Sequence, residues 1–154
     1  MPMTKMVEYE PPGALAVPVD TAGPRRRIYA YRLRDGRAPA VDGLEALDPQ
    51  AQARYFARFR EMGMNGQLRG KYYHPWKGKA KGMAAFKDNQ SQTRIPSFPD
   101  GAGNLILTHV IEGKKEDKIP EADENEALRY RAEYLERKAR MMPKAAAAGG
   151  GRGR

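Results

Sequence analysis

Residues 104–111, NLILTHVI, form an almost unbroken apolar run, and this run restricts the fold more than any other feature of the chain. It follows the turn sequence PDGAG at residues 99–103, which is typical of the start of a β-strand. Side chains of a strand point alternately to two faces, so a strand that is apolar throughout must be covered on both. We therefore expect this segment to be the central strand of a sheet.

A strand and a helical region are predicted earlier in the chain. Residues 25–36, RRRIYAYRLRDG, have the β-branched and aromatic content of a strand that ends in an Asp-Gly turn. Tyr29, Tyr31 and Leu33 lie on one face of that strand. After the stretch APAVDG, a helical region is expected from Leu44.

A second helical segment is predicted after residue 47. Asp48 is well placed to cap it, and Pro49 suits its first position. Apolar residues spaced four, four and three apart predict its buried face: Ala51, Tyr55, Phe59 and Met62. Gly63 is predicted to end the helix.

Two short strands, KGMAAFKDN and QTRIPSF, are predicted to form a hairpin around residues 88–91. Pro96 lies in the second of them and cannot donate to the hydrogen-bond ladder. That strand is therefore expected to expose this position at an edge or to form a bulge there.

The last predicted element is a helix that begins at Pro120 and ends at Pro143. Acidic residues in its first turn and basic residues in its last turns suit the helix dipole. Its buried face is predicted from residues at helical spacing: Leu128, Ala132, Leu135, Ala139 and Met142. Tyr130 and Tyr134, one turn apart, are expected to pack rather than to do chemistry.

The chain of 154 residues has room for one compact domain but hardly for two. Five prolines break up the N-terminal region, so residues 1–27 are predicted to be a flexible arm with no regular element. Residues 28–142 are predicted to form the domain. Residues 143–154, rich in Ala, Gly and Arg, are predicted to be a disordered basic tail.

The net charge of +9 is concentrated in one stretch. Residues 66–94 contain seven Lys or Arg and a single acid, so six of the nine net positive charges fall there. A small chain with a localised basic stretch most often binds a polyanion, because neutralising phosphates releases counterions. The sequence therefore favours a nucleic-acid partner.

Other features exclude several classes of protein. The chain has no Cys, which excludes disulfides and thiolate metal sites, and two His, which makes a zinc cage improbable. No long apolar run suggests a membrane span, and the N-terminus does not have the pattern of a secretory signal. We expect a cytoplasmic protein with no cofactor.

Several short segments, spread over residues 29–135, resemble the RelE/HigB superfamily of toxins, specifically its phage-derived HigB-like branch. These are YRLRDGRAPAVDG, the two helical segments, HPWKGKAKGMAAF, QTRIPSF, and LILTHVIEGKKEDKIPEADENEALRYRAEYL. The resemblance implies an α+β domain with a small, twisted and largely antiparallel sheet, two N-terminal helices packed on one side and a C-terminal helix after the last strand.

The resemblance also implies an activity and partners. Such a protein is a ribosome-dependent endoribonuclease that cuts messenger RNA by metal-free attack of the ribose 2′-hydroxyl, and a cognate helix-turn-helix antitoxin silences it. Cations are needed to stabilise the charge that develops on the phosphate.

Carried onto this sequence, the resemblance gives a candidate catalytic set: Lys87, Arg94, Lys115 and His109. Lys114, Lys81, Lys79 and Lys77 would steer the RNA. Simpler interpretations exist for some of these residues. A lysine run is usually a solvated loop, and a histidine inside an apolar run is more often a structural core residue than a catalytic one. His74 and Trp76 suit base stacking, although loop aromatics more often anchor a hairpin.

Departures from the family pattern keep other functions open. Ala85 stands where Glu or Lys is common, Ala84 where an aromatic residue is common, and His109 lies one residue further from the double lysine than the family's histidine. One alternative is therefore a non-catalytic, phage-like protein of the same fold that binds a host protein or nucleic acid. The basic tail alone would favour a third function, a basic structural protein associated with ribosomes or DNA.

Overall fold

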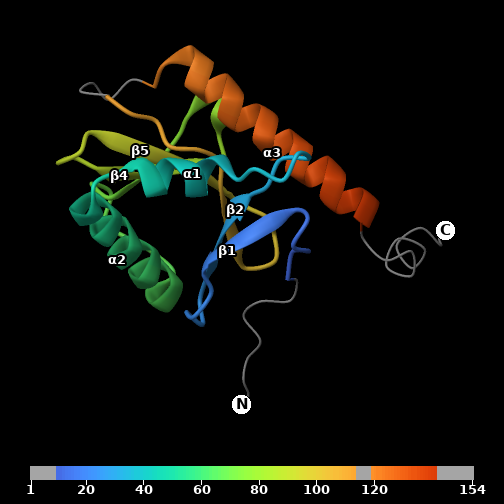
Figure 1. Ribbon diagram of the computed structural model, residues 1–154, viewed down its shortest axis with the longest axis horizontal. Coiled ribbons are helices and arrows are strands. Elements are labelled where there is room, and N and C mark those ends of the chain that lie inside the picture. The colour runs from blue at the N-terminus through green and yellow to red at the C-terminus, as the bar shows by residue number, and fades with distance from the viewer. Residues whose placement is uncertain (1–9, 114–118, 142–154) are drawn as a thin grey trace.

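The protein is represented by a computed structural model that describes residues 10–113 and 119–141. These residues form a six-stranded sheet with the strand order β1-β2-β6-β5-β4-β3 (Figure 1). The strands are β1 (Ala16–Asp20), β2 (Arg27–Tyr31), β3 (Tyr73–Pro75), β4 (Ala84–Asp88), β5 (Thr93–Pro99) and β6 (Asn104–Leu107). The helices are α1 (Pro39–Ala46), α2 (Pro49–Asn65), α3 (Glu121–Met141) and the short 3-10 turn η1 (Gly78–Ala80).

The sheet is mixed but mostly antiparallel. Only the β2–β6 ladder is parallel among the five ladders of the described residues. β6 lies in the interior of the sheet, between β2 and β5, and all four of its residues are buried. The predicted α+β class and the predicted central strand are both confirmed.

Helices cover both faces of the sheet (Figure 1), and alternate residues of β2 divide the core into two clusters. Tyr29 and Tyr31 pack in the cluster that contains the buried residues of α3. Ile28 and Ala30 pack in the cluster that contains the buried residues of α1 and α2. Two N-terminal helices on one side and a C-terminal helix are therefore confirmed, with α3 on the opposite face.

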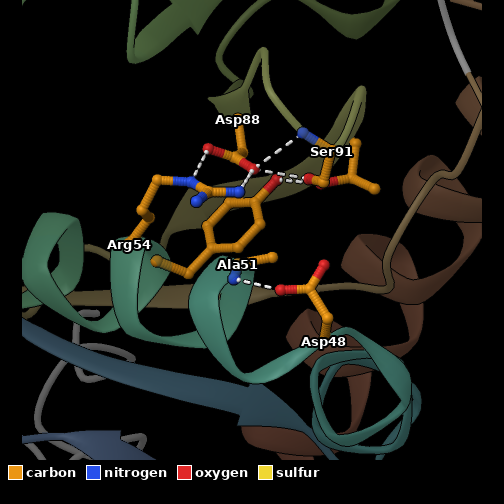
Figure 2. A network of polar contacts seen from close by, with 7 residues as sticks. Asp48, Ala51, Arg54, Asp88 and Ser91 are labelled. Atoms are coloured by element: carbon orange, nitrogen blue, oxygen red, sulfur yellow. Dashed lines mark hydrogen bonds and ion pairs between the residues drawn. The ribbon is translucent and has the colours of Figure 1, made fainter.

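The start of α2 is the one predicted. Figure 2 shows the Asp48 carboxylate accepting a hydrogen bond from the Ala51 amide, with an N···O distance of 2.9 Å. Pro49 occupies the first turn, where its missing N–H costs no helical bond. The predicted buried face is also confirmed.

The predicted end of α2 is wrong, because Gly63 has a different role. The helix continues to Asn65, and Gly66, with φ +82°, provides the left-handed cap. The Gly63 carbonyl accepts backbone hydrogen bonds from Arg25 and Arg26. A Cβ on Gly23 would lie 2.2 Å from the Gly63 carbonyl carbon, so two backbones meet here with no room for a side chain.

The predicted flexible arm, residues 1–27, is wrong for part of its length. β1 pairs antiparallel with β2, and Leu15 and Ala16 are buried beside it. Pro18 is tolerated because β1 is an edge strand, which needs hydrogen bonds on one side only. The ladder shifts register between Pro18 and Asp20. The domain thus begins before residue 28; residues 1–9 and 142–154 lie outside the described residues.

α1 also begins earlier than predicted, at Pro39 instead of Leu44. Pro39 occupies the first turn, where proline is favourable. Gly43 does not interrupt the helix. A Cβ at this position would lie 2.5 Å from Cγ2 of Val110, so the glycine lets α1 approach the chain after β6.

The predicted buried face of α3 is wrong. The face that packs against the sheet is rotated about the helix axis relative to the predicted one. The helix buries Ala127, Tyr130, Tyr134 and Arg137, whereas Leu135 is 44% exposed. Tyr134 donates a hydrogen bond to Asp100 and packs edge-on against Phe98. Tyr130 packs against Tyr31, so the packing role predicted for the two tyrosines is confirmed. Two large aromatic rings outweigh the aliphatic pattern from which the face was predicted.

Candidate functional site

The β4–β5 hairpin places two of the predicted cations side by side. The hairpin forms around residues 88–91 as predicted, and Lys87 is the direct cross-strand partner of Arg94. Direct partners project from the same face of a sheet, and here it is the α3 face, to which Ala85 also points. Arg94 is 6% exposed and Lys87 is half-buried.

A β-bulge follows where β5 meets the chain after β6. Ser97 pairs with Leu107, and Arg94 forms an isolated bridge with Ile111. Two residues of β5 therefore face three residues, 108–110, on the opposite side. The Thr108 amide donates to the Pro96 carbonyl, so the missing N–H of Pro96 also faces this irregular segment. The bulge predicted from Pro96 is confirmed.

A partly buried ion pair holds the end of the hairpin against α2 (Figure 2). Arg54 donates two hydrogen bonds to the Asp88 carboxylate, at 2.8 and 2.9 Å, and Ser91 donates two more. Burial alone would raise the pKa of Asp88, but the hydrogen bonds from Arg54 and Ser91 outweigh it and lower this pKa below its ordinary value. Asp88 stays charged at neutral pH.

The same network continues into the core. Tyr55 and Thr93 share a hydrogen bond of 2.7 Å between their hydroxyl oxygens, and burial raises the pKa of Tyr55 far above its usual range. Thr93 also shares a hydrogen bond with Ser91. α2 thereby fixes the turn of the hairpin, and this fixes the position of the Lys87–Arg94 pair on the opposite face.

Lys87 and Arg94 open into a small pocket of about 80 Å³. The pocket is lined by His74, Trp76, Ala85, Lys87, Arg94 and Ile119. It combines two cations with an imidazole, and its other walls are apolar. Its volume suits a group of the size of a phosphate, and its charge suits an anion.

His74 also lines the pocket, although the sequence did not place it among the predicted catalytic residues. It pairs with Ala85 across the β3–β4 ladder, and Ala85 pairs with Pro96, so His74 projects from the same face as Lys87 and Arg94. It is exposed. His74 and Trp76 are two residues apart in the sequence, which is the spacing of side chains on one face of a strand. The sequence does not show which residues of the neighbouring strand they pair with.

Trp76 anchors the loop that contains η1, which is the more common role of a loop aromatic residue. It is 8% exposed, and its amide donates to the Met83 carbonyl, which closes the loop that contains η1. The indole belongs to the core cluster on the α3 face while it lines the pocket.

His109, a predicted catalytic residue, does not line this pocket. It is 6% exposed and lies in the bulged segment, which turns its ring toward α3. Its Nε2 lies 3.4 Å from a carboxylate oxygen of Asp123. The bulged segment thus places the ring of His109 against α3 and not in the pocket.

The predicted RNA-steering lysines do not share one environment. Lys77 and Lys81 are exposed on the loop around η1. Lys79 is held by the first turns of α3: its Nζ donates to Asn125 at 2.7 Å and lies 3.8 Å from Glu124. Lys114 and Lys115 lie outside the described residues, so their position relative to the pocket stays a prediction.

A larger depression lies elsewhere, along the end of α2. It has a volume of about 640 Å³ and is open, and Arg25, Arg69 and Glu61 are among the residues that line it. Its charges are of mixed sign and it contains none of the predicted site residues. The small pocket on the hairpin is therefore the candidate site.

Comparisons with known proteins give partial similarity to a solved structure. No family model matches the chain, and no curated protein does. Among solved structures, a chain of the toxin–antitoxin complex RelBE2 from Mycobacterium tuberculosis is similar, at 16% identity and a TM-score of 0.33. The matched region covers 50% of this chain and 91% of that one. This similarity is too low to carry an argument about function, and it does not single out the HigB branch. None of the helices in the described ranges is long and apolar enough to cross a membrane.

Proposed function

We propose that this protein is a RelE/HigB-like toxin that cleaves messenger RNA on the ribosome. The observation that carries the proposal is the meeting of Lys87, Arg94 and His74 in one pocket on the sheet. The sequence resemblance supplies the ribosome, the messenger RNA and a helix-turn-helix antitoxin as partners, and the phage-derived HigB branch. The cytoplasm as the site of action is proposed from the amino-acid composition and the N-terminal sequence.

The reaction needs three contributions that this pocket can make. The ribose 2′-hydroxyl loses a proton and its oxygen forms a bond to the adjacent phosphorus; the bond from phosphorus to the 5′-oxygen breaks, and that oxygen gains a proton. Lys87 and Arg94 would bind the phosphate and stabilise the charge that develops on it. His74, the only imidazole that lines the pocket, would transfer a proton.

Residues around the pocket would bind the rest of the RNA. Exposed Lys77 and Lys81 lie on the loop that follows Trp76, where they would contact the phosphate backbone. We propose the same role for Lys114, and phosphate binding for Lys115, on the sequence resemblance alone.

A second candidate function is binding without cleavage. Ala85 lines the pocket where the family commonly has Glu or Lys, so one charged group of the cleft is missing. A protein of this kind would bind RNA or a host protein through the same basic surface and leave transcripts intact.

Induced expression with mapping of transcript ends tests the proposal. We expect growth arrest and new ends within translated codons. Lys87→Ala should reduce cleavage roughly 100-fold, because one charge-assisted contact to the transition state is lost. Arg140→Gln is the matched control: it removes one positive charge from an exposed site at the far end of α3, and cleavage should stay at the wild-type level.

Two further variants separate the roles within the pocket. Arg94→Lys keeps the charge but loses the two-pronged geometry of guanidinium, so it should cleave more slowly while it remains folded. His74→Gln should reduce cleavage while RNA binding persists. Normal growth with intact transcripts, for wild-type protein present in the cell at high level, would instead support the binding function.

A further inference from the structure

His109 lies where two carboxylates from α3 meet the bulged segment after β6. Its Nε2 is 3.4 Å from Asp123 Oδ1 and 3.8 Å from Glu126 Oε1. Asp123 and Glu126 are three residues apart, so both project from the same side of the helix. The proposed reaction uses none of these three side chains.

The Thr108 side chain holds the imidazole ring from its other side. Its hydroxyl lies 3.3 Å from the Pro96 carbonyl oxygen and 3.0 Å from His109 Nδ1. Nε2 is therefore the ring nitrogen that faces the two carboxylates. When the ring carries its hydrogen on Nδ1, Nε2 and the two carboxylates present only lone pairs to one another, and a cation between the three atoms would satisfy all of them.

The distances suit a metal ion. Zinc bonds to imidazole nitrogen and carboxylate oxygen are about 2.1 Å long, so two ligands of a tetrahedral ion lie about 3.4 Å apart. The two contacts of Nε2, at 3.4 and 3.8 Å, are close to that separation. All three donor atoms lie within 4.8 Å of one another.

Outer contacts also fix the ligands in the way that metal sites require. Thr108 orients the imidazole through Nδ1, and the Tyr130 hydroxyl donates to Glu126 Oε2 at 2.8 Å, which leaves Oε1 directed at His109. The histidine is 6% exposed, whereas the side chains of Asp123 and Glu126 are 27% and 36% exposed, so an ion can enter from the helix side.

We propose that His109, Asp123 and Glu126 bind a divalent transition-metal ion, of which Zn²⁺ is the representative. Two carboxylates and a neutral imidazole carry two negative charges, which match a dication. The ion joins the bulged segment, residues 108–110, to the first turns of α3 and so has a structural role. This site is separate from the pocket and does not depend on the proposed function.

Calorimetric titration of the untagged full chain, stripped with a chelator, tests the site. We expect Zn²⁺ to bind at one saturable equivalent and to raise the thermal unfolding temperature. Asp123→Asn and Glu126→Gln keep the shape of each side chain, and each should weaken Zn²⁺ binding roughly tenfold or more. Glu121→Gln removes a charge from the same turn without facing His109, and it should bind Zn²⁺ as the wild type does.

The other histidine provides a second control. His74→Gln should leave Zn²⁺ binding unchanged, and loss of binding in that variant would place the ion in the pocket and overturn the proposal. Absence of saturable binding to the wild type would also overturn it, as would equal binding by all the variants. Because the measurement is metal binding, it is independent of whether the protein cleaves RNA.

Discussion

Neighbouring residues of β4 carry opposite charges to opposite faces of the sheet. Lys87 points to the α3 face, where the pocket lies, and Asp88 points to the α2 face, where Arg54 neutralises it. Without Arg54, the negative charge of Asp88 would not be neutralised and, lying next to Lys87 in the strand, would reduce the positive field of the pocket. The charge of the pocket thus depends on an ion pair on the other side of the strand.

The Asp88 pair should also contribute strongly to stability. Asp88→Asn leaves the Arg54 guanidinium without its anion and should lower the free energy of unfolding by about 2–4 kcal/mol, measured by urea denaturation at neutral pH. Asp35→Asn is the control: Asp35 pairs with Arg37 at the surface, with more than half of each side chain exposed, and stability should not change measurably.

The pH dependence of this contribution has a definite sign. Because the folded protein lowers the pKa of Asp88, its stabilisation is fully present above the ordinary carboxyl pKa of about 4 and is lost as pH falls through the lowered value. The stability difference between wild type and Asp88→Asn should therefore shrink in acid. A difference that stays constant down to the lowest pH at which the protein folds would contradict this assignment.

At the level of elements, the sequence predicted the strands and helices better than it predicted their orientation. The hairpin followed from the turn at residues 88–91, and its register then paired Lys87 with Arg94. The rotation of α3 did not follow, because Leu128 and Leu135 have the expected spacing and only the sheet determines which side they face. Likewise, the partners of His74 and His109 are set by strand register, which no spacing along the chain reveals.

Arg137 lies on the buried face of α3 but was not part of the predicted one. It is 7% exposed, and its guanidinium donates to the carbonyls of Ala14 and Arg32 and to the Tyr31 hydroxyl. Arg137→Gln should lower the free energy of unfolding by about 1–3 kcal/mol, because the Ala14 and Arg32 carbonyls and the buried Tyr31 hydroxyl lose their charged donor. Arg140→Gln, exposed one turn away, should have no measurable effect on urea denaturation, and equal effects of the two variants would mean that Arg137 is not an anchor.

For the whole molecule, the N-terminal region determines where the folded unit begins. Leu15 is fully buried in the cluster on the α3 face, although the prolines around it favoured a mobile arm. Leu15→Ala should lower the free energy of unfolding by about 2–4 kcal/mol, in the range of buried leucine truncations. Glu10→Ala, at an exposed position, is the control. Identical denaturation curves for the two variants would mean that the segment around Leu15 does not contribute to the folded domain and is a flexible arm.

The close approach of Gly23 to Gly63 has a consequence for the ancestry of this chain. A change from glycine to any larger residue at position 23 would press its Cβ into the main chain of Gly63, and no rearrangement of side chains could relieve this clash. Substitution at this position therefore requires a shift of the main chain near the end of α2, so relatives should lose the glycine only together with further changes in this segment. An alignment of homologues would reveal such coupled changes even where the basic residues of the pocket have diverged.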